Sequence, residues 1–337
     1  MIEQNQKAVA TPIAAVLCLS LGLVLFSGGH SPAAAEEWNF YMHQSAPNFA
    51  TSRGAKLFTE EIEKATNGEL KVRLHLAGTL QINASNITQA VGENVVQMGD
   101  DLFNSGNIPV AGIPRLPMLV QSYDDFAKAD AALRPYLEKS FGQKGVTLLA
   151  SYTYPLQFMW GRKKIVSLAD IKGLKLRVAQ PEQGEFVRYF GGTSITMSAP
   201  EVPSALDRGV VDGIFTAGVG AVLWKDLLKY GYQLIVNVNN SYYIANTDAF
   251  NKLSHDLQTK LRQVSQDTAR WNQETMQKEE AESVQTLTAM GYTFTKATPD
   301  EVSSAVEAMK PYWSEWAKAR GGDVVEALAT VRKALGR

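Results

Sequence analysis

The sequence predicts an α/β protein with more than one domain. Strand-like and helix-like segments alternate from residue 38 to residue 245, which is typical of sheets with largely parallel strand pairing. At 337 residues, the chain is longer than most single hydrophobic cores support. Residues 255–290 contain neither proline nor glycine and repeat apolar residues at helical spacing. One helix there would be about 54 Å long, so it must lie across two domains.

The first half of the chain opens with a short apolar and aromatic strand over 38–42. Apolar residues recur at helical spacing over 55–66, and Asn67-Gly68 ends that helix. Over 70–76, apolar residues alternate with charged ones, which is the period of a strand. The same patterns predict helices over 84–94 and 124–140, and strands over 95–98 and 146–154.

The second half continues the alternation and then becomes helical. We expect strands over 174–178, 194–197, 210–215, 234–238 and 242–245, and helices over 184–189, 199–207 and 222–230. Two helices, 299–320 and 323–335, finish the chain. For the long helix, the alternative is two helices with a break near Trp271-Asn272.

The N-terminus has the parts of a secretory signal peptide. Lys7 precedes an apolar run over 13–26, and the small residues Ala33-Ala34-Ala35 provide a cleavage site. The run is shorter than the ~20 residues of a membrane span. We expect cleavage near Ala35 and export to the periplasm. An uncleaved anchor, or a lipoprotein site at Cys18, is the alternative.

Composition and motifs exclude several function classes. Lys and Arg total 33 against 34 Asp and Glu, so the chain lacks the basic excess of a nucleic-acid binder. The single cysteine, Cys18, excludes a disulfide scaffold and a thiolate metal site. No nucleophile elbow, zinc-protease motif or phosphate loop is present. Asp100 and Asp101 are adjacent on a predicted strand, so their side chains should point to opposite faces.

Two segments stand out, over 167–178 and over 198–213. In the first, Leu176 and Val178 share one face of a strand, which leaves Lys175 and Arg177 on the other. A buried guanidinium needs a partner, and its planar fork suits a carboxylate. On spacing alone, an exposed edge arginine, or one paired with a structural acid, is the alternative.

These segments resemble the DctP-type solute-binding proteins of tripartite ATP-independent periplasmic (TRAP) transporters. Leu168–Val178 matches the family's Leu-x-Asp-Leu-Lys-Gly-Leu-Lys-Ile-Arg-Val stretch, and Glu201–Gly213 matches its Glu-Val-x-x-Ala-Leu-x-x-Gly-Val-Val-Asp-Gly stretch. The resemblance extends from the strand at Trp38 through Lys56–Glu61 to the long helix. It implies a two-lobed periplasmic binding protein, of the Venus-flytrap kind, whose long helix spans both lobes. It also implies that Arg177 grips the ligand carboxylate.

Departures from the family pattern bear on the ligand. Sialic-acid and C4-dicarboxylate binders carry a second arginine upstream, where this chain has Tyr154–Gly161 and no cation until Arg162. They place an acidic and amide pair where this chain has Ile214-Phe215-Thr216. We therefore expect a less polar pocket and a monocarboxylate. Besides Arg177, the expected ligand-binding residues are Asp101, which matches a family pocket position, and Trp160, Phe215, Thr216, Phe158 and His43. Core packing is the alternative for Trp160 and Phe215.

The expected partners are a small organic acid and membrane permease subunits on separate chains, with no nucleic acid, cofactor or metal ion. Lobe I is expected over 36–154 and 244–283, and lobe II over 155–243 and 284–337. The resemblance implies a binding protein and no enzyme. A periplasmic ligand sensor for a signalling receptor is the alternative, and a hydrolase or lyase with Asp101 as its base is a further one.

Overall fold

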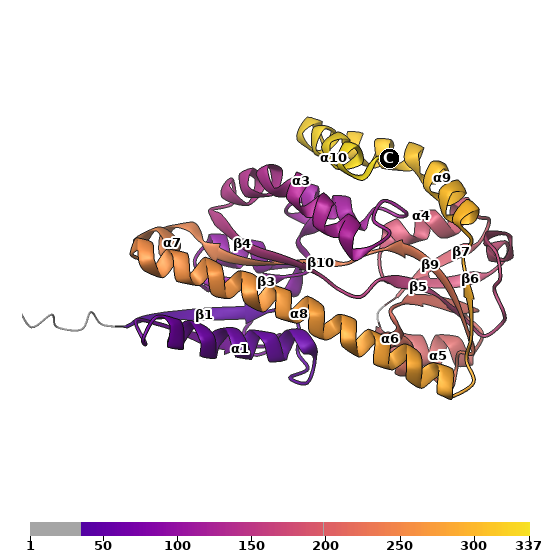
Figure 1. The fold of residues 1–337 in the computed structure, drawn as a ribbon, viewed down its shortest axis with the longest axis horizontal. Helices are drawn as coiled ribbons and strands as arrows, with labels where there is room; N and C mark the ends of the chain where they lie inside the picture. The colour runs from indigo at the N-terminus through magenta and orange to yellow at the C-terminus, as the bar shows by residue number, and fades with distance from the viewer. Residues whose placement is uncertain (1–34, 198) are drawn as a thin grey trace, which may run out of the picture. The chain divides into compact units, whose positions relative to one another are not determined.

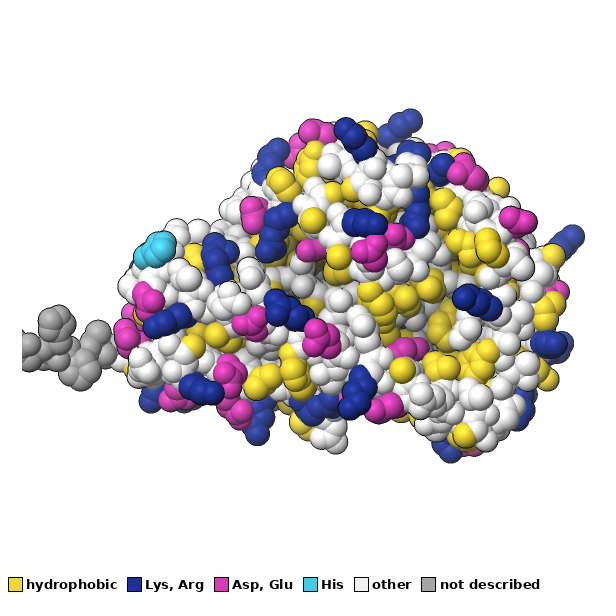
Figure 2. Space-filling view, viewed as in Figure 1, with side chains coloured by type: hydrophobic (Ala, Val, Ile, Leu, Met, Phe, Trp, Pro, Cys, Tyr) yellow, Lys and Arg dark blue, Asp and Glu magenta, His cyan; other side chains and the backbone are white. Residues whose placement is uncertain are grey.

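A computed structural model describes residues 35–197 and 199–337 of the chain. The predicted signal peptide lies outside these residues, apart from Ala35. Within them, no helix has both the length and the apolar composition that crossing a membrane would require. On the face shown in Figure 2, basic and acidic side chains are interspersed.

The first sheet has five strands in the order β2-β1-β3-β10-β4. They are β1 (Glu36–Met42), β2 (Leu70–His75), β3 (Met98–Asp101), β4 (Val146–Thr153) and β10 (Asn240–Asn246). One face packs against α1 (Ala50–Ala65) and the beginning of α8 (His255–Ala289). The other face is covered by α2 (Ile87–Gly92), α3 (Tyr123–Gly142) and the 3-10 helix η3 (Pro109–Arg115). The short helices η1 (Ala84–Asn86), η2 (Asn104–Gly106) and α7 (Thr247–Lys252) complete this part.

The second sheet has six strands in the order β11-β9-β5-β8-β6-β7. They are β5 (Gln157–Gly161), β6 (Lys175–Val178), β7 (Thr193–Thr196), β8 (Gly213–Thr216), β9 (Tyr230–Asn237) and β11 (Thr293–Lys296). One face packs against α5 (Val202–Asp207), α6 (Gly218–Val222) and the end of α8. The other face is covered by α4 (Pro181–Tyr189) and α9 (Pro299–Lys318). The 3-10 helices η4 (Leu168–Ile171) and η5 (Ala199–Glu201) precede β6 and α5.

Both sheets are mixed, with five parallel and four antiparallel strand pairings, so parallel pairing predominates less than expected. β1 runs parallel to β2 and β3, but β10 runs antiparallel to β3 and β4. In the second sheet, β6 runs parallel to β7 and β8, whereas β5 runs antiparallel to β8 and β9. Every antiparallel pairing involves β5 or β10, the strands that follow the two short crossovers from one sheet to the other. The chain enters the second sheet again along α8, and there β11 runs parallel to β9.

The long helix is a single piece, as expected. Ser254 caps its N-terminus by accepting a hydrogen bond from the Leu257 backbone N–H at 3.3 Å. Apolar side chains from Leu257 to Met276 pack into the core of the first sheet, and Leu287 packs into the core of the second. One rigid helix therefore contributes to both sheets, and Figure 1 shows α8 running from the one to the other. The alternative of a break near Trp271-Asn272 is wrong.

Several boundaries differ from expectation. The strand expected over 95–98 is β3, three residues later, because Asn94 has φ 59° and turns the chain first. The helix expected over 222–230 is α6, which begins at Gly218 because the Glu280 carboxylate accepts hydrogen bonds from the Gly218 and Val219 backbone N–H groups. Its expected end, Tyr230, belongs to β9 instead. Strands β5 and β11 were not predicted.

The expected lobe division remains a prediction, and two features of the structure bear on it. The boundary at 243/244 falls inside β10, which lies wholly in the first sheet. The C-terminal helix α10 (Gly322–Leu335), expected in lobe II, packs beside α3 on the first sheet. Lys139 on α3 pairs with Asp323 on α10 at 2.7 Å. By these contacts, the last residues of the chain return to the first sheet.

Candidate functional site

The seven predicted ligand-binding residues fall into two groups, one on each sheet. His43 follows β1, and Asp101 ends β3, so both lie at the carboxyl-terminal edge of the first sheet. Phe158, Trp160, Arg177, Phe215 and Thr216 lie on the adjacent strands β5, β8 and β6 of the second sheet. Within the described part of the chain, no hydrogen bond or ion pair joins one group to the other.

The two groups lie on the edges that the crossovers connect. The first crossover, residues 154–156, leads from the end of β4 to the start of β5. The second, residues 238–239, leads from the end of β9 to the start of β10. These crossovers join two sheet edges. One edge, in the first sheet, carries His43 and Asp101, and the other, in the second sheet, carries Phe158 and Thr216. Ligands of open α/β sheets bind outside the carboxyl ends of parallel strands, at such an edge.

Arg177 is a buried cation held by neutral carbonyl groups. Its side chain is 6% exposed and lies opposite the buried Leu176 and Val178, as the alternation predicted. Its Nε and Nη2 donate to the Met197 carbonyl at 3.0 and 2.9 Å, and its Nη1 donates to the Phe215 carbonyl at 3.4 Å. Burial lowers the pKa of Arg177, and the nearby Glu201 carboxylate opposes this shift. A carboxylate from a ligand would meet a fixed guanidinium here.

The second sequence motif explains how β8 comes to lie beside β6. The Asp212 carboxylate accepts a hydrogen bond from the Lys175 backbone N–H at 2.9 Å. At Gly213, a Cβ atom would lie 2.4 Å from the carbonyl oxygen of Trp160, so only glycine allows β5 to approach this closely. The register then puts Arg177 opposite Ile214, which is itself opposite Trp160. Asp212 and Gly213 thus allow β8 to lie between β5 and β6, the strand that carries Arg177.

The three aromatic residues that were predicted to contact the ligand are less exposed than expected. Trp160 is fully buried, packs against Phe158, Tyr292 and Phe294, and donates from Nε1 to the Thr216 carbonyl at 3.0 Å. Phe215 is fully buried in the core on the opposite face, and Phe158 is buried beside Trp160. The core-packing alternative therefore describes Trp160 and Phe215 in this structure. A role of these side chains at the ligand remains a prediction.

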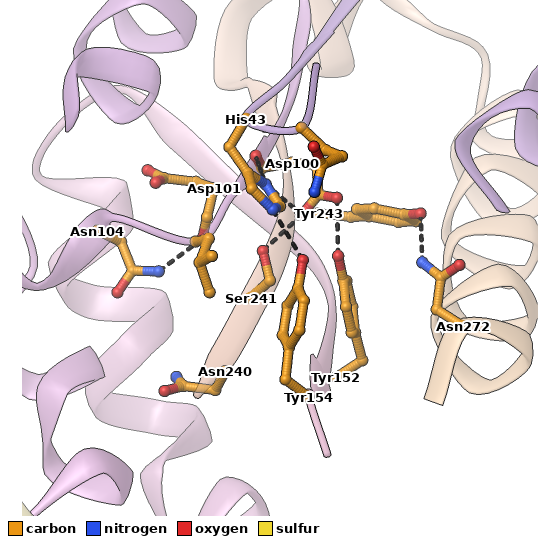
Figure 3. A network of polar contacts seen from close by, with 12 residues as sticks. His43, Asp100, Asp101, Asn104, Tyr152, Tyr154, Asn240, Ser241, Tyr243 and Asn272 are labelled. Atoms are coloured by element: carbon orange, nitrogen blue, oxygen red, sulfur yellow. Dashed lines mark hydrogen bonds and ion pairs between the residues drawn. The ribbon is translucent and has the colours of Figure 1, made fainter. Parts of the chain in front are cut away.

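A buried polar network lies at the edge of the first sheet (Figure 3). The Asp100 carboxylate accepts hydrogen bonds from the Tyr152 hydroxyl at 2.7 Å and the Ser241 hydroxyl at 2.5 Å. His43 Nδ1 lies 3.2 Å from the Asp100 carbonyl, and its Nε2 lies 2.7 Å from the Tyr154 hydroxyl. Since a carbonyl only accepts, Nδ1 carries the proton in the neutral ring, and Nε2 accepts from Tyr154. This network fixes the first crossover, which begins at Tyr154, to the strand end that carries Asp101.

Asp101 points away from Asp100, as its position on the strand predicted, and lies in a different environment. Its Oδ2 accepts a hydrogen bond from the Thr88 hydroxyl, and its buried Oδ1 has no partner among the described residues. Asn104 holds the following turn, since its Nδ2 donates to the Asp101 carbonyl at 2.6 Å. Burial raises the pKa of Asp101 to about 7, although the Thr88 bond and Arg115 lower it. Asp101 is therefore an acid that can take up or release a proton near neutral pH.

The raised pKa of Asp101 makes the free energy of unfolding depend on pH. Between about pH 4 and pH 7 the folded chain keeps a proton on Asp101 that the unfolded chain releases, so stability falls as pH rises through this range. Asp101→Asn should therefore exceed the wild-type stability at pH 8 by on the order of a few kcal/mol, and lose this advantage at pH 4. Urea unfolding of both proteins across this range measures the difference. A difference that does not change with pH would contradict the assignment.

An amide junction joins both crossovers to the end of the strand that carries Arg177. Gln183, fully buried on α4, donates from Nε2 to Gln157 Oε1 at 2.7 Å and to Asn237 Oδ1 at 2.8 Å. Its Oε1 accepts from the Ala179 backbone N–H at 2.9 Å. Gln180 Nε2 donates to Asn239 Oδ1 at 2.7 Å. These bonds fix both crossovers to the start of α4, directly after β6.

Removing the central amide of this junction should destabilise the fold. Gln183→Leu leaves the fully buried Asn237 Oδ1 acceptor and the part-buried Gln157 Oε1 and Ala179 N–H groups without their partner, and a buried unpaired group costs about 1–3 kcal/mol. We expect a loss of about 2–4 kcal/mol in the free energy of unfolding, measured by urea titration. Gln143→Leu, at an exposed position after α3, is the matched control and should change stability by less than about 0.5 kcal/mol. Equal effects of the two substitutions would show that the junction does not contribute.

A small cavity of about 80 Å³ adjoins the first crossover. Its lining comes from the start of α1, from Tyr154 and Pro155 in the crossover, from Val219 on α6, and from Met276 and Glu279 on α8. Pockets that bury small ligands are typically several times larger. Elements of both sheets thus surround a space that is too small for an organic acid in this arrangement.

Sequence reasoning missed several polar groups of the site. Tyr154, Gln183 and Asn240 were not predicted as site residues, because each lacks a chemical motif, and Asp100 was considered only as the neighbour of Asp101. Asn240 accepts from Arg115 Nε at 2.9 Å, and Arg115 Nη2 also donates to the Asn240 and Leu102 carbonyls. The signal that could have identified them is their position in the chain. Tyr154 and Asn240 flank the crossovers, so a correct placement of β5 and β10 would have brought them to the site.

Two α/β sheets joined by two short crossovers and one long helix, with polar groups at the joined edges, define a two-lobed solute-binding protein. Residues 41–319 match the bacterial extracellular solute-binding protein family 7, the DctP family. The chain belongs to this family. Its members are solute-binding proteins of TRAP transporters and are not enzymes, which confirms the expected family, fold class and lack of catalysis.

Individual relatives are similar over most of their length. The C4-dicarboxylate-binding periplasmic protein DctP of Rhodobacter capsulatus is 24% identical over 298 residues, which cover 86% of this chain and 89% of the relative. The sialic acid-binding periplasmic protein SiaP of Vibrio cholerae is 24% identical over 327 residues, which cover 93% and 98%. The crystal structure of DctP7, a Bordetella pertussis extracytoplasmic solute receptor binding pyroglutamic acid, is 25% identical with a TM-score of 0.76, and the match covers 88% of this chain and 100% of that one.

Proposed function

We propose that this chain is a periplasmic receptor that binds a small monocarboxylic acid between its two lobes and delivers it to a TRAP permease on separate chains. The observation that carries the proposal is Arg177, a buried cation bonded to neutral carbonyl groups at the sheet edge that the crossovers connect to the other lobe. A guanidinium in such surroundings binds a carboxylate through two charge-assisted hydrogen bonds.

A monocarboxylate is favoured because the second buried cation near the site is already engaged. Arg115 donates to Asn240 and to the Leu102 carbonyl, and Asp101 lies close enough to act on its charge. Among the described residues, no lysine or arginine other than Arg115 and Arg177 is buried, so a second carboxylate on the ligand would have to displace the bonds of Arg115. Pyroglutamate, which the Bordetella pertussis relative binds, is a monocarboxylic acid with a ring and is a suitable first compound to test.

Binding would work through the equilibrium between open and closed arrangements of the lobes. We place the lobe boundaries at the crossovers, residues 154–156 and 238–239, and assign α10 to the lobe of the first sheet with which it packs. A ligand that touches Arg177 from one lobe and the His43 and Asp101 edge from the other favours the closed arrangement, because only that arrangement makes both sets of contacts. The permease would then recognise the closed form.

A thermal-shift panel of organic acids tests this function. A ligand at 100 times its Kd adds about 2.7 kcal/mol to the free energy of unfolding. We expect monocarboxylates, with pyroglutamate and 2-oxo acids among them, to raise the melting temperature, and succinate and sialic acid to leave it unchanged. A shift with succinate alone would contradict the monocarboxylate assignment, and a shift with sialic acid alone would contradict the expectation of a less polar pocket. No shift with any acid would contradict the function.

Export is tested separately. The apolar run over 13–26 and the alanines before Glu36 favour cleavage of a signal peptide near Ala35. N-terminal sequencing of protein from the periplasmic fraction should begin at or near Glu36. An intact Met1 in the membrane fraction would contradict both cleavage and a freely diffusing receptor.

A further inference from the structure

Two aromatic side chains remain exposed at the edge of the first sheet where the predicted site lies. Phe49 is 49% exposed and Phe103 is 47% exposed, and they lie in the segments that follow β1 and β3. In contrast, Trp160 and Phe215, the aromatic side chains expected to contact the ligand, are fully buried. If the ligand has an apolar body, the first sheet offers exposed aromatic surface for it, and the second sheet offers Arg177.

Phe103 is held in place by the polar network around it. Its ring stands edge-on to the His43 ring, with centroids 6.1 Å apart, and His43 stands in the same way against Tyr154. Both His43 nitrogens have hydrogen-bond partners, so the histidine ring is fixed. On the other side, the buried Asn104 anchors the turn to the Asp101 carbonyl. Contacts on both sides thus fix the position of Phe103, while half of its surface stays open.

Phe103 is better placed than Phe49 to contact a ligand. Phe49 lines the small cavity at the first crossover, together with Pro155, Val219 and Met276, so part of its surface already faces other apolar groups. Phe103 lies two residues after Asp101 and packs against His43, the two residues of the first sheet that the sequence assigned to the site. An apolar group beside two polar ones, on a sheet edge that the crossovers connect to the edge with Arg177, suits a pocket that orients an acid by its head and selects it by its body.

We propose that Phe103 is a specificity-determining residue that forms the apolar wall for the ligand's body and selects acids with a ring or branched chain over those with one to three carbons. This inference rests on the proposed function, since it requires a carboxylate at Arg177. A ligand body that covers most of the exposed ring surface, roughly 55–95 Å², corresponds to about 10- to 50-fold in Kd.

Matched pairs of acids test this directly. Each pair shares its carboxylate head and differs in its body: pyruvate with 4-methyl-2-oxopentanoate, and lactate with 3-phenyllactate. Titration calorimetry of the wild type should give tighter binding of the larger member of at least one pair. Phe103→Ala should weaken that member by about 10- to 50-fold and the smaller one by less than about 3-fold. Phe103→Leu should retain most of the affinity, because leucine keeps much of the apolar surface.

Tyr189→Ala is the control variant. Tyr189 is an aromatic side chain on α4, 60% exposed, in the groove between α4 and α9, and its removal should leave every Kd unchanged. Unchanged affinities in both Phe103 variants, or equal losses for both members of a pair, would overturn the inference while leaving the proposed function intact. Tighter wild-type binding of the smaller acids would also overturn it. A wild type that binds none of the acids would overturn the inference together with the proposed function.

Discussion

Arg177→Ala should abolish most of the ligand affinity and leave the free protein nearly as stable as the wild type. A charge-assisted pair contributes about 1.5–3 kcal/mol or more when desolvated, so Kd should rise ten- to several-hundredfold. In the unliganded protein, the substitution removes the hydrogen-bond donor of the Met197 and Phe215 carbonyls. It also removes a buried cation, whose desolvation costs free energy. We expect these effects to offset each other to within about 1 kcal/mol. Calorimetric titration and urea unfolding of the same variant measure the two quantities.

Three further substitutions separate a ligand clamp from a structural ion pair. Arg177→Lys should also bind poorly, because an ammonium cannot form the planar fork. Glu201→Gln should bind at least as tightly as the wild type, because the Glu201 charge acts on Arg177 and competes with a ligand carboxylate. Arg162→Ala removes an exposed cation bonded to the Leu206 carbonyl and should leave the affinity unchanged. A loss of many degrees in melting temperature for Arg177→Ala would instead assign Arg177 to a structural pair.

Gly213→Ala should be the most destabilising single substitution considered. The added Cβ would lie 2.4 Å from the Trp160 carbonyl oxygen and 3.1 Å from Leu176 Cδ2, so β5 and β8 would have to separate. We expect a loss of about 3 kcal/mol or more in the free energy of unfolding. Ligand binding should fall as well, because the same strands position Phe215 and Arg177.

The matched control for this substitution is Gly142→Ala. Gly142 ends α3, has open space around its Cα, and should tolerate a Cβ or gain a little stability from better helix propensity. Urea unfolding, followed by tryptophan fluorescence, compares the two variants. If Gly213→Ala proves as stable as Gly142→Ala, the close approach of β5 and β8 does not depend on glycine.

The long, periodic elements could be predicted from the sequence because their patterns are local. The helix α8 was correct to within one residue at its C-terminus, and α3, α9 and α10 were close, since each repeats apolar residues along one face. The strand β5 was missed because it is short and buried on both faces, so Phe158 to Gly161 shows no alternation. The start of α6 was missed because Glu280, more than sixty residues later in sequence, fixes it.

Only the part of the candidate site that lies in a sequence motif could be predicted from the sequence. The alternation in β6 correctly placed Arg177 opposite Leu176 and Val178. It could not show that neutral carbonyls would hold the guanidinium, since Phe215 lies on β8 and Met197 directly follows β7. Trp160 looked like a ligand contact because it is aromatic and near the motif, but its burial depends on Tyr292 and Phe294, which come much later in the chain. The network around Asp100 joins residues far apart in sequence, so no local pattern indicates it.

We propose that Arg177 holds the carboxylate of a small monocarboxylic acid between the two lobes. Native purification from the periplasm, followed by mass spectrometry of the released small molecules, tests this role most directly when wild type and Arg177→Ala are prepared side by side. We expect a single class of monocarboxylic acid at near-stoichiometric amounts from the wild type and its loss from the variant. Recovery of the same acid from both proteins, or of a neutral or cationic compound from the wild type, would contradict it.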